Sequence, residues 1–213
     1  MPQQQPDGFL ATPPDGKGRP VLVLHAWWGL NDTIKTFCKR LADAGFVAFA
    51  ADLYHGKVTD QIAEAEKLGA ALDSRFEEAR AEVAHAAEFL KAYTGASTIA
   101  VIGFSLGAVY AMDLSATKPE SVRAVVLFYG SGPLDFSASQ AAYLGHYAEL
   151  DEYEPAEYMQ ETKEELEKAN RPVTFYTYPG TKHWFFEPDR PDAYNPEAAA
   201  LAWERTLTFL QQS

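Results

Sequence analysis

The sequence predicts an α/β protein whose sheet is mostly parallel and covered by helices on both faces. Runs of apolar, often β-branched residues alternate with segments of helical periodicity along all 213 residues. These runs stay apolar at nearly every position, which is typical of parallel strands buried on both faces. No Gly/Ser/Pro-rich linker divides the chain, so we expect one domain over residues 1–213.

The first strand–helix–strand unit follows Thr12–Pro20, a proline- and glycine-rich stretch predicted to be a turn between two strands. Pro20–Trp27 is predicted to be a strand, and Asn31 and Asp32 are residue types that cap the helix after it. The apolar face of that helix follows the spacing of one helix side: Ile34, Phe37, Cys38, Leu41 and Ala42. Gly45 is predicted to end the helix before strand Phe46–Leu53.

The rest of the chain continues this alternation. A second helix is predicted to begin at a capping box of Ser74 and Glu77, whose side chains would satisfy free N–H groups of the first turn. Its apolar face is Val83, Ala86, Ala87 and Leu90. The later predicted elements are strand Thr98–Phe104, helix Leu106–Thr117, strands Val122–Tyr129 and Ala142–Tyr147, helix Pro155–Asn170, strand Pro172–Tyr178 and helix Pro196–Leu210.

Composition narrows the classes of function. With 18 basic and 30 acidic residues, the net charge is 18 − 30 = −12, which disfavours nucleic acids and anionic membranes as partners. Apolar runs are strand-length, well short of a membrane span. Met1–Asp7 lacks the cationic and apolar parts of a secretory signal, and Cys38 has no second cysteine to pair with. We expect a cytoplasmic monomer without metal or cofactor.

One motif carries chemistry. Gly103–Gly107 reads G-x-S-x-G between an apolar strand and a helix, the arrangement that presents a nucleophilic serine, here Ser105, on a tight turn. Flanking glycines let neighbouring backbones pass closely, and the helix that follows directs N–H groups at the reaction site. Because ligands of parallel sheets bind at the carboxyl ends of strands, this position suits a catalytic site.

A serine nucleophile needs a base, and on this type of sheet the base follows the serine in the chain. Of the five histidines, two do so, His146 and His183. His146 lies inside an apolar strand, where a packed core histidine is expected. His183 lies in the loop after the last predicted strand, so we predict that it is the base. His25 and His55 end strands nearby and are predicted to have packing or turn roles.

The base in turn needs a carboxylate that orients it. Asp151 lies just past the strand that precedes the strand of His183, and it is the predicted acid. The same turn also holds Glu149, Glu152 and Glu154. Asp135, one strand earlier, is the second choice.

Backbone N–H groups and aromatic side chains complete the predicted site. The N–H groups of Trp27 and Leu106 are the candidate oxyanion donors, since one follows a strand end and the other begins the helix after the serine. An aromatic-lined substrate cleft is predicted from five residues: Trp28, Phe104, Tyr129, Trp184 and Phe185.

Several motifs occur together in a familiar order. They are Gly8–Pro13 as an opening strand, Trp28–Asn31, Ala51–Gly56, the Ser105 turn, and Gly180 with His183 and Phe185. In these motifs the chain resembles the dienelactone hydrolase family, over nearly all of its length. The resemblance implies an α/β-hydrolase fold without a large lid domain, and a Ser/Cys–His–Asp triad acting on lactones or small carboxylic esters.

The resemblance also shows three departures. Family members that cleave dienelactone have a cysteine nucleophile where this chain has Ser105, and a glutamate that modulates the thiol where it has Ala26. They have a substrate-binding arginine where this chain has Glu187. The first two changes are consistent with each other, because a serine forms no thiolate and so needs no glutamate to modulate it. The third argues against an anionic substrate held in the same way.

Together these features predict a serine hydrolase that cleaves carboxylic esters or lactones through an acyl-enzyme. Two alternatives stay open: a ligand-binding or receptor-like protein built on a hydrolase fold, and an acyltransferase that passes the acyl group to an alcohol or thiol. Cys38 lies on the apolar face of a predicted helix, so we expect it to be a buried side chain and not a nucleophile.

Overall fold

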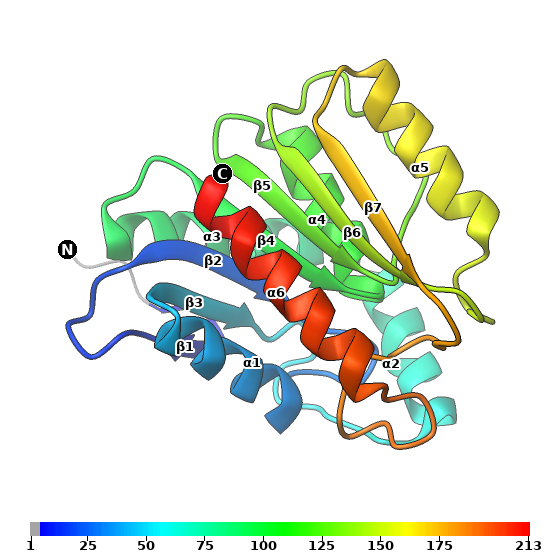
Figure 1. The fold of residues 1–213 in the computed structure, drawn as a ribbon. Helices are drawn as coiled ribbons and strands as arrows, with labels where there is room; N and C mark the ends of the chain where they lie inside the picture. The colour runs from blue at the N-terminus through cyan, green and yellow to red at the C-terminus, as the bar shows by residue number, and fades with distance from the viewer. Residues whose placement is uncertain (1–4) are drawn as a thin grey trace.

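The computed structural model describes residues 5–213, so the first residues of Met1–Asp7, on which the expectation about a secretory signal depends, lie outside it. Its sheet has strand order β1-β3-β2-β4-β5-β6-β7, in which β1 is antiparallel to β3 and every other neighbouring pair is parallel (Figure 1). The strands are β1 Gly8–Ala11, β2 Arg19–Leu24, β3 Phe46–Ala51, β4 Ile99–Phe104, β5 Val122–Phe128, β6 Ala142–Ala148 and β7 Val173–Tyr178. The predicted α/β class is confirmed.

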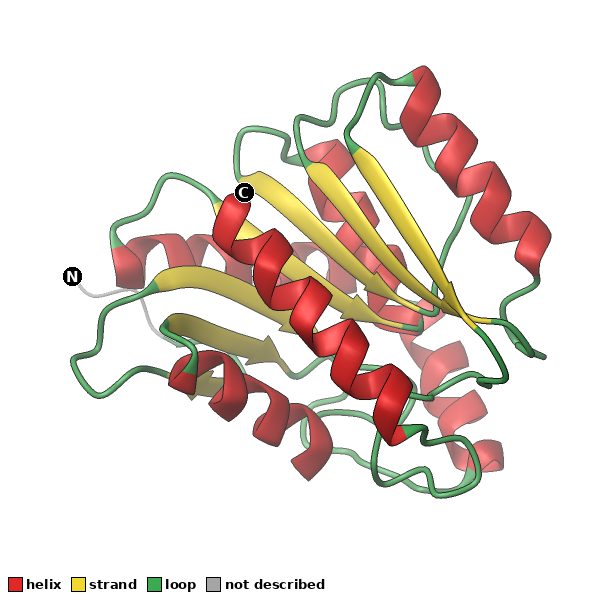
Figure 2. Ribbon diagram, viewed as in Figure 1, coloured by secondary structure: helices red, strands yellow, loops and turns green. Residues whose placement is uncertain are grey.

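Helices lie on both faces of this sheet (Figure 2). The core on one face is shared with α1 and α6, and the core on the other with α3, α4 and part of α5. Along β2 the buried side chains alternate between the two cores, Val21 and Val23 on one side and Leu22 and Leu24 on the other. The helices are α1 Asp32–Asp43, α2 Ile62–Asp73, α3 Phe76–Thr94, α4 Leu106–Thr117, α5 Ala156–Lys168 and α6 Pro196–Gln212.

The predicted caps have different outcomes. Asn31 caps α1, its side chain accepting a hydrogen bond from the N–H of Ile34 at 3.1 Å, and Gly45 follows the helix with φ 91°. The prediction of a capping box at Ser74 is wrong. The Ser74 hydroxyl donates to the carbonyl of Ala71 at 2.7 Å, because Ser74 ends a helix, α2, instead of beginning one.

Helix α2 itself was not predicted from the sequence. Its buried positions have helical spacing, but two of the four are the small residues Ala65 and Gly69, and no side chain caps its N-terminus. A narrow apolar stripe without a capping residue gives little indication of a helix in the sequence. In the structure α2 lies beyond the carboxyl ends of the strands, where it borders the candidate site (Figure 1). Within residues 5–213, no helix combines the length and apolar character needed to cross a membrane.

Candidate active site

Ser105 occupies the tight turn between β4 and α4. Its backbone has φ 49° and ψ −115°, a conformation that L-residues rarely adopt, and its N–H donates to the carbonyl of Phe128 at 2.8 Å. The neighbouring glycines are required by close backbone contacts. A Cβ at Gly103 would lie 2.4 Å from the carbonyl oxygen of Gly107, and a Cβ at Gly107 would lie 2.4 Å from that of Leu24. The surrounding backbones therefore hold Ser105 in this strained conformation.

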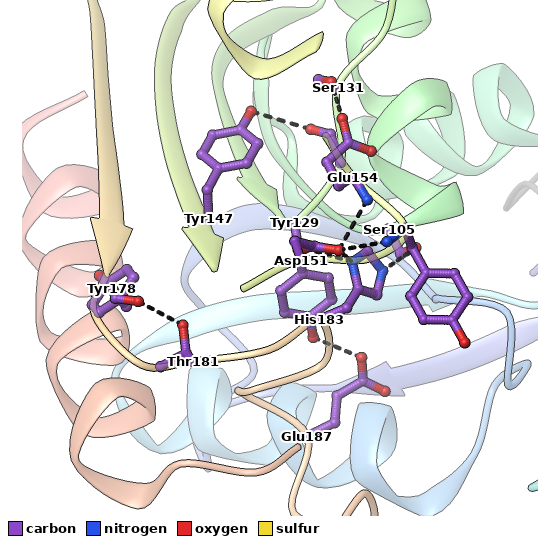
Figure 3. A network of polar contacts seen from close by, with 12 residues as sticks. Ser105, Tyr129, Ser131, Tyr147, Asp151, Glu154, Tyr178, Thr181, His183 and Glu187 are labelled. Carbon is purple, nitrogen blue, oxygen red and sulfur yellow. Dashed lines mark hydrogen bonds and ion pairs between the residues drawn. The ribbon is translucent and has the colours of Figure 1, made fainter. Parts of the chain in front are cut away.

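The structure brings Ser105, His183 and Asp151 together at the carboxyl end of the sheet (Figure 3). The hydroxyl oxygen of Ser105 lies 2.9 Å from Nε2 of His183, and Nδ1 of His183 lies 2.9 and 2.8 Å from the two carboxylate oxygens of Asp151. The side chains of His183 and Asp151 are each 4% exposed. These contacts join residues from three loops, following β4, β6 and β7.

The loop after β6 holds the Asp151 carboxylate in place. Its Oδ1 accepts hydrogen bonds from the backbone N–H groups of Tyr153 and Glu154, both at 2.9 Å. The N–H of Leu150 donates to the carbonyl of Thr181 at 2.9 Å, which ties this loop to the one that carries His183. These backbone contacts fix the orientation of the Asp151 carboxylate toward His183.

The other acids considered for this role lie elsewhere. Asp135 is exposed and accepts a hydrogen bond from the N–H of Ser137 in its own turn, at 2.8 Å. Glu149 accepts from the N–H of Gly180 at 2.8 Å. Glu154 bonds to Ser131, and Glu152 is exposed. Among the acids considered, Asp151 is the one hydrogen-bonded to His183 in the described structure.

The two candidate oxyanion donors follow β2 and β4, which are neighbours in the sheet. Leu106 is the first residue of α4, and the first N–H groups of a helix have no partner within it. Trp27 lies in a turn that is closed by a hydrogen bond from the N–H of Gly29 to the carbonyl of Ala26 at 3.2 Å, so this closing bond does not use the Trp27 N–H.

The geometry agrees with a comparison of the chain with known proteins. A model of the dienelactone hydrolase family matches residues 7–213. The chain belongs to this family. Dienelactone hydrolases cleave the cyclic ester bond of a lactone, so the protein is a carboxylic ester hydrolase, and the resemblance predicted from its motifs is confirmed.

Individual relatives support the same assignment. A protein of Aquifex aeolicus (strain VF5) named "Putative carboxymethylenebutenolidase" is 33% identical over 96% of this chain and 92% of its own length. A Bradyrhizobium protein named "Probable 2-oxo-3-(5-oxofuran-2-ylidene)propanoate lactonase" is 31% identical over 95% of this chain and 88% of its own. Among solved structures, a dienelactone hydrolase-like promiscuous phosphotriesterase from metagenomic libraries shares the fold, with a TM-score of 0.83 at 22% identity over 92% of this chain and 87% of its own.

The predicted aromatic cleft needs correction in this family member. Trp184 lines a pocket of about 120 Å³ that also contains His183. Trp28, Tyr129 and Phe185 are instead buried in the core shared with α1 and α6, and Phe104 stacks there on Phe128 at 4.6 Å. Residues from α1, α6 and the strands bury these four side chains, a long-range packing that the sequence pattern did not resolve. The pocket is otherwise lined by Ile62, Leu150, Glu152, Tyr153, Lys182, Asp192 and Ala193.

Three residues near Asp151 and His183 make contacts that were not predicted from the sequence. The ring of Tyr153 lies 5.3 Å from the His183 ring. Glu187 is fully buried and accepts a hydrogen bond at 2.6 Å from the hydroxyl of Tyr129, whose ring is 4.9 Å from that of His183. Burial raises the pKa of Glu187 to about 8. Burial likewise raises the pKa of Glu154 to about 7. Glu154 and Glu187 make these contacts with residues distant in the sequence. Nothing in the local sequence of an acidic chain indicates which acids are buried.

Two of the remaining histidines, His146 and His25, and the cysteine have packing roles, whereas His55 is an exposed turn residue and His85 is exposed on α3. His146 is buried between the Tyr178 hydroxyl, 2.8 Å away, and the Thr206 hydroxyl, 3.0 Å away, and burial lowers its pKa to about 3. His25 Nε2 accepts a hydrogen bond from the N–H of Leu53 at 3.2 Å. Burial raises the pKa of the Cys38 thiol to about 12, which leaves it a thiol at neutral pH and not a nucleophile.

Proposed function

We propose that the protein is a serine hydrolase that cleaves small, uncharged carboxylic esters or lactones through Ser105, His183 and Asp151. The observation that carries this proposal is the continuous pair of contacts from Ser105 to His183 at 2.9 Å and from His183 to Asp151 at 2.8 Å. Nucleophile, base and orienting acid are within hydrogen-bonding distance in the order that acyl transfer needs.

The reaction begins when the Ser105 oxygen attacks the ester carbonyl carbon and its proton passes to Nε2 of His183. Asp151 accepts a hydrogen bond from the Nδ1–H of the same ring, which holds the tautomer that can take a proton at Nε2. The N–H groups of Trp27 and Leu106 donate to the oxyanion of the tetrahedral intermediate. His183 then protonates the leaving alcohol oxygen, and Ser105 keeps the acyl group.

Water completes the cycle. It attacks the acyl-enzyme carbonyl while His183 takes one of its protons, and collapse of the second intermediate returns that proton to Ser105 and releases the acid. For a lactone, the alcohol and the acid are the two ends of one product.

The charges around His183 support an uncharged substrate. The pocket that contains His183 is lined by Glu152, Asp192 and Lys182, and the chain carries a net charge of −12. Glu187, which stands where the dienelactone-cleaving relatives have an arginine, is buried and offers no positive charge. The two acids of this pocket outnumber its lysine, Lys182, which disfavours a carboxylate on the substrate. The proposal also includes a monomeric state and a cytoplasmic location. The unpaired thiol of Cys38 supports the cytoplasmic location.

The first test is hydrolysis of p-nitrophenyl acetate and of an uncharged lactone by the wild-type protein and by Ser105→Ala. We expect the substitution to lower kcat by about 10⁴-fold or more, since the covalent route is lost. Ser137→Ala, at an exposed serine, is the matched control and should keep full activity. Equal activity in Ser105→Ala would falsify the proposal.

Two other outcomes of this test separate the alternatives. A wild-type protein that binds esters without turnover would indicate a ligand-binding protein. Products that partition toward an added alcohol or thiol in preference to water would indicate an acyltransferase.

A further inference from the structure

A second acid lies beside Asp151 and joins two loops of the site. The Glu154 carboxylate accepts a hydrogen bond from the hydroxyl of Ser131, in the loop after β5, while the backbone N–H of Glu154 donates to Oδ1 of Asp151 at 2.9 Å (Figure 3). Ser131 is 8% exposed. Glu154 therefore connects the loop that holds the predicted acid to a loop that has no other role in the mechanism.

The contacts of Glu154 reach the nucleophile from the other side as well. The Tyr147 hydroxyl, whose pKa the Glu154 charge helps to raise, donates to the carbonyl of Gly130 at 3.2 Å. Gly130 packs directly on the serine turn, since a Cβ there would lie 2.6 Å from the carbonyl oxygen of Ser105. The Glu154 charge thus acts electrostatically on a side chain that bonds to the backbone beside the nucleophile.

The charge state of Glu154 changes within the neutral range. Burial and, to a smaller extent, the Asp151 charge raise its pKa to about 7, while hydrogen bonds from Ser131 act in the opposite direction. The titratable groups that face it are Asp151 on its own loop, Tyr147 on β6, which stays neutral, and His183 beyond Asp151. Below about pH 7 Glu154 is neutral, and above it Glu154 is a carboxylate.

We propose that Glu154 is a positioning residue for the reaction, anchoring the Asp151 loop through Ser131 and adding a second negative charge behind Asp151 that favours the imidazolium form of His183. This inference rests on the proposed function, because the imidazolium forms when Ser105 transfers its proton. A charge that is present only above neutral pH stabilises that cation only there.

Glu154→Gln separates the charge from the anchor, because the amide oxygen still accepts the Ser131 hydrogen bond. The ratio of kcat/KM for wild type over Glu154→Gln should be near one at pH 5.5. At pH 8.5 it should rise to about three- to tenfold, mostly through kcat, as expected for one charge acting across a partly buried site. Glu157→Gln, an exposed acid in the first turn of α5, is the matched control and should leave the ratio near one throughout.

Ser131→Ala provides a second, independent test. It removes a donor that lowers the pKa of Glu154, so the rise in activity attributed to Glu154 should move to higher pH. This variant keeps the carboxylate, and it still tests the proposal if Glu154→Gln does not fold. A wild-type to Glu154→Gln ratio of kcat/KM that is above one but the same at every pH would show a merely structural residue. A ratio of one at every pH would show no role in the reaction, and either result overturns the proposal.

An NMR titration of the Glu154 carboxyl carbon removes the dependence on turnover. In wild type the carboxyl should lose its proton near pH 7, and in Ser131→Ala at higher pH. Loss of the proton near pH 4.5 in both proteins would overturn the pH-dependent role of Glu154 even if the protein is an active esterase. A wild type inert toward every ester, with both titrations as expected, would instead count against the proposed function alone.

Discussion

Two buried acids lie near His183, and they are held in different ways. The side chain of Asp151 is 4% exposed and accepts hydrogen bonds from the N–H groups of Tyr153 and Glu154 as well as from the His183 ring. Glu187 is fully buried and accepts one hydrogen bond, from the hydroxyl of Tyr129. Within residues 5–213 its second oxygen, Oε2, has no hydrogen-bond partner.

The comparison contrasts a carboxylate that has several hydrogen-bond donors with one that has a single donor. Removing a carboxylate from water disfavours its charge, and donors restore it. Asp151 has donors on a rigid turn, whereas burial raises the pKa of Glu187 to about 8, so it is mostly a neutral acid at pH 7. One acid can therefore stabilise an imidazolium, while the other holds the Tyr129 ring against His183 without adding charge.

The largest expected effect comes from changing the charged acid. Asp151→Asn keeps the shape but offers an amide to the Nδ1 side of His183, which favours the wrong tautomer. We expect kcat to fall by about 10⁴-fold with the fold retained, by analogy with the same change in serine proteases. Ester hydrolysis and circular dichroism would check this. A decrease of less than tenfold would mean that another acid supports His183, contrary to the comparison.

Local patterns predicted most of this fold and the three residues of the proposed triad. The apolar strands, the helix of Ile34 to Ala42 and the G-x-S-x-G turn are short-range features. Chain order left two histidines as candidate bases, and position relative to the strands selected His183, in a loop, over His146, inside a strand. Asp151 was selected over Asp135 in the same way, and its hydrogen bond to His183 agrees with that choice. Such features can be predicted because each depends on residues close together in the sequence.

The features that sequence reasoning missed depend on tertiary contacts. Helix α2 has small residues on its buried side and no side-chain cap, and long-range packing buries four of the five aromatic residues predicted for the cleft. Burial of Glu154 and Glu187 follows from loops distant in the chain. No local pattern distinguishes these two acids from the many solvated acids of a chain with 30 of them.

A smaller effect is expected from removing the single donor to the neutral acid. Tyr129→Phe removes the hydroxyl that donates to Glu187, so the fully buried carboxyl group loses its hydrogen-bond donor. We expect a loss of about 1–3 kcal/mol in the free energy of unfolding at pH 7, the usual cost of an unsatisfied buried polar group. Urea denaturation would measure it. Wild-type stability in this variant would mean that Glu187 finds another partner, and the contrast with Asp151 would weaken.

The most specific effect concerns pH. The folded protein holds the Glu187 proton up to about pH 8, whereas an unfolded chain releases it near pH 4.5, so between these values the folded state binds more protons and its stability falls as pH rises. Glu187→Gln cannot ionise. Relative to wild type, it should therefore gain stability with increasing pH, by at most about 1.4 kcal/mol per pH unit, and the gain should stop above about pH 8.

Urea denaturation of wild type and Glu187→Gln from pH 5 to pH 9 would measure this gain. Glu204→Gln, an exposed acid on α6, is the matched control, and its stability should run parallel to that of wild type. Parallel curves for Glu187→Gln as well would show that Glu187 is charged in the folded state. Burial would then not have suppressed its ionisation, and the difference from Asp151 would have to come from geometry alone.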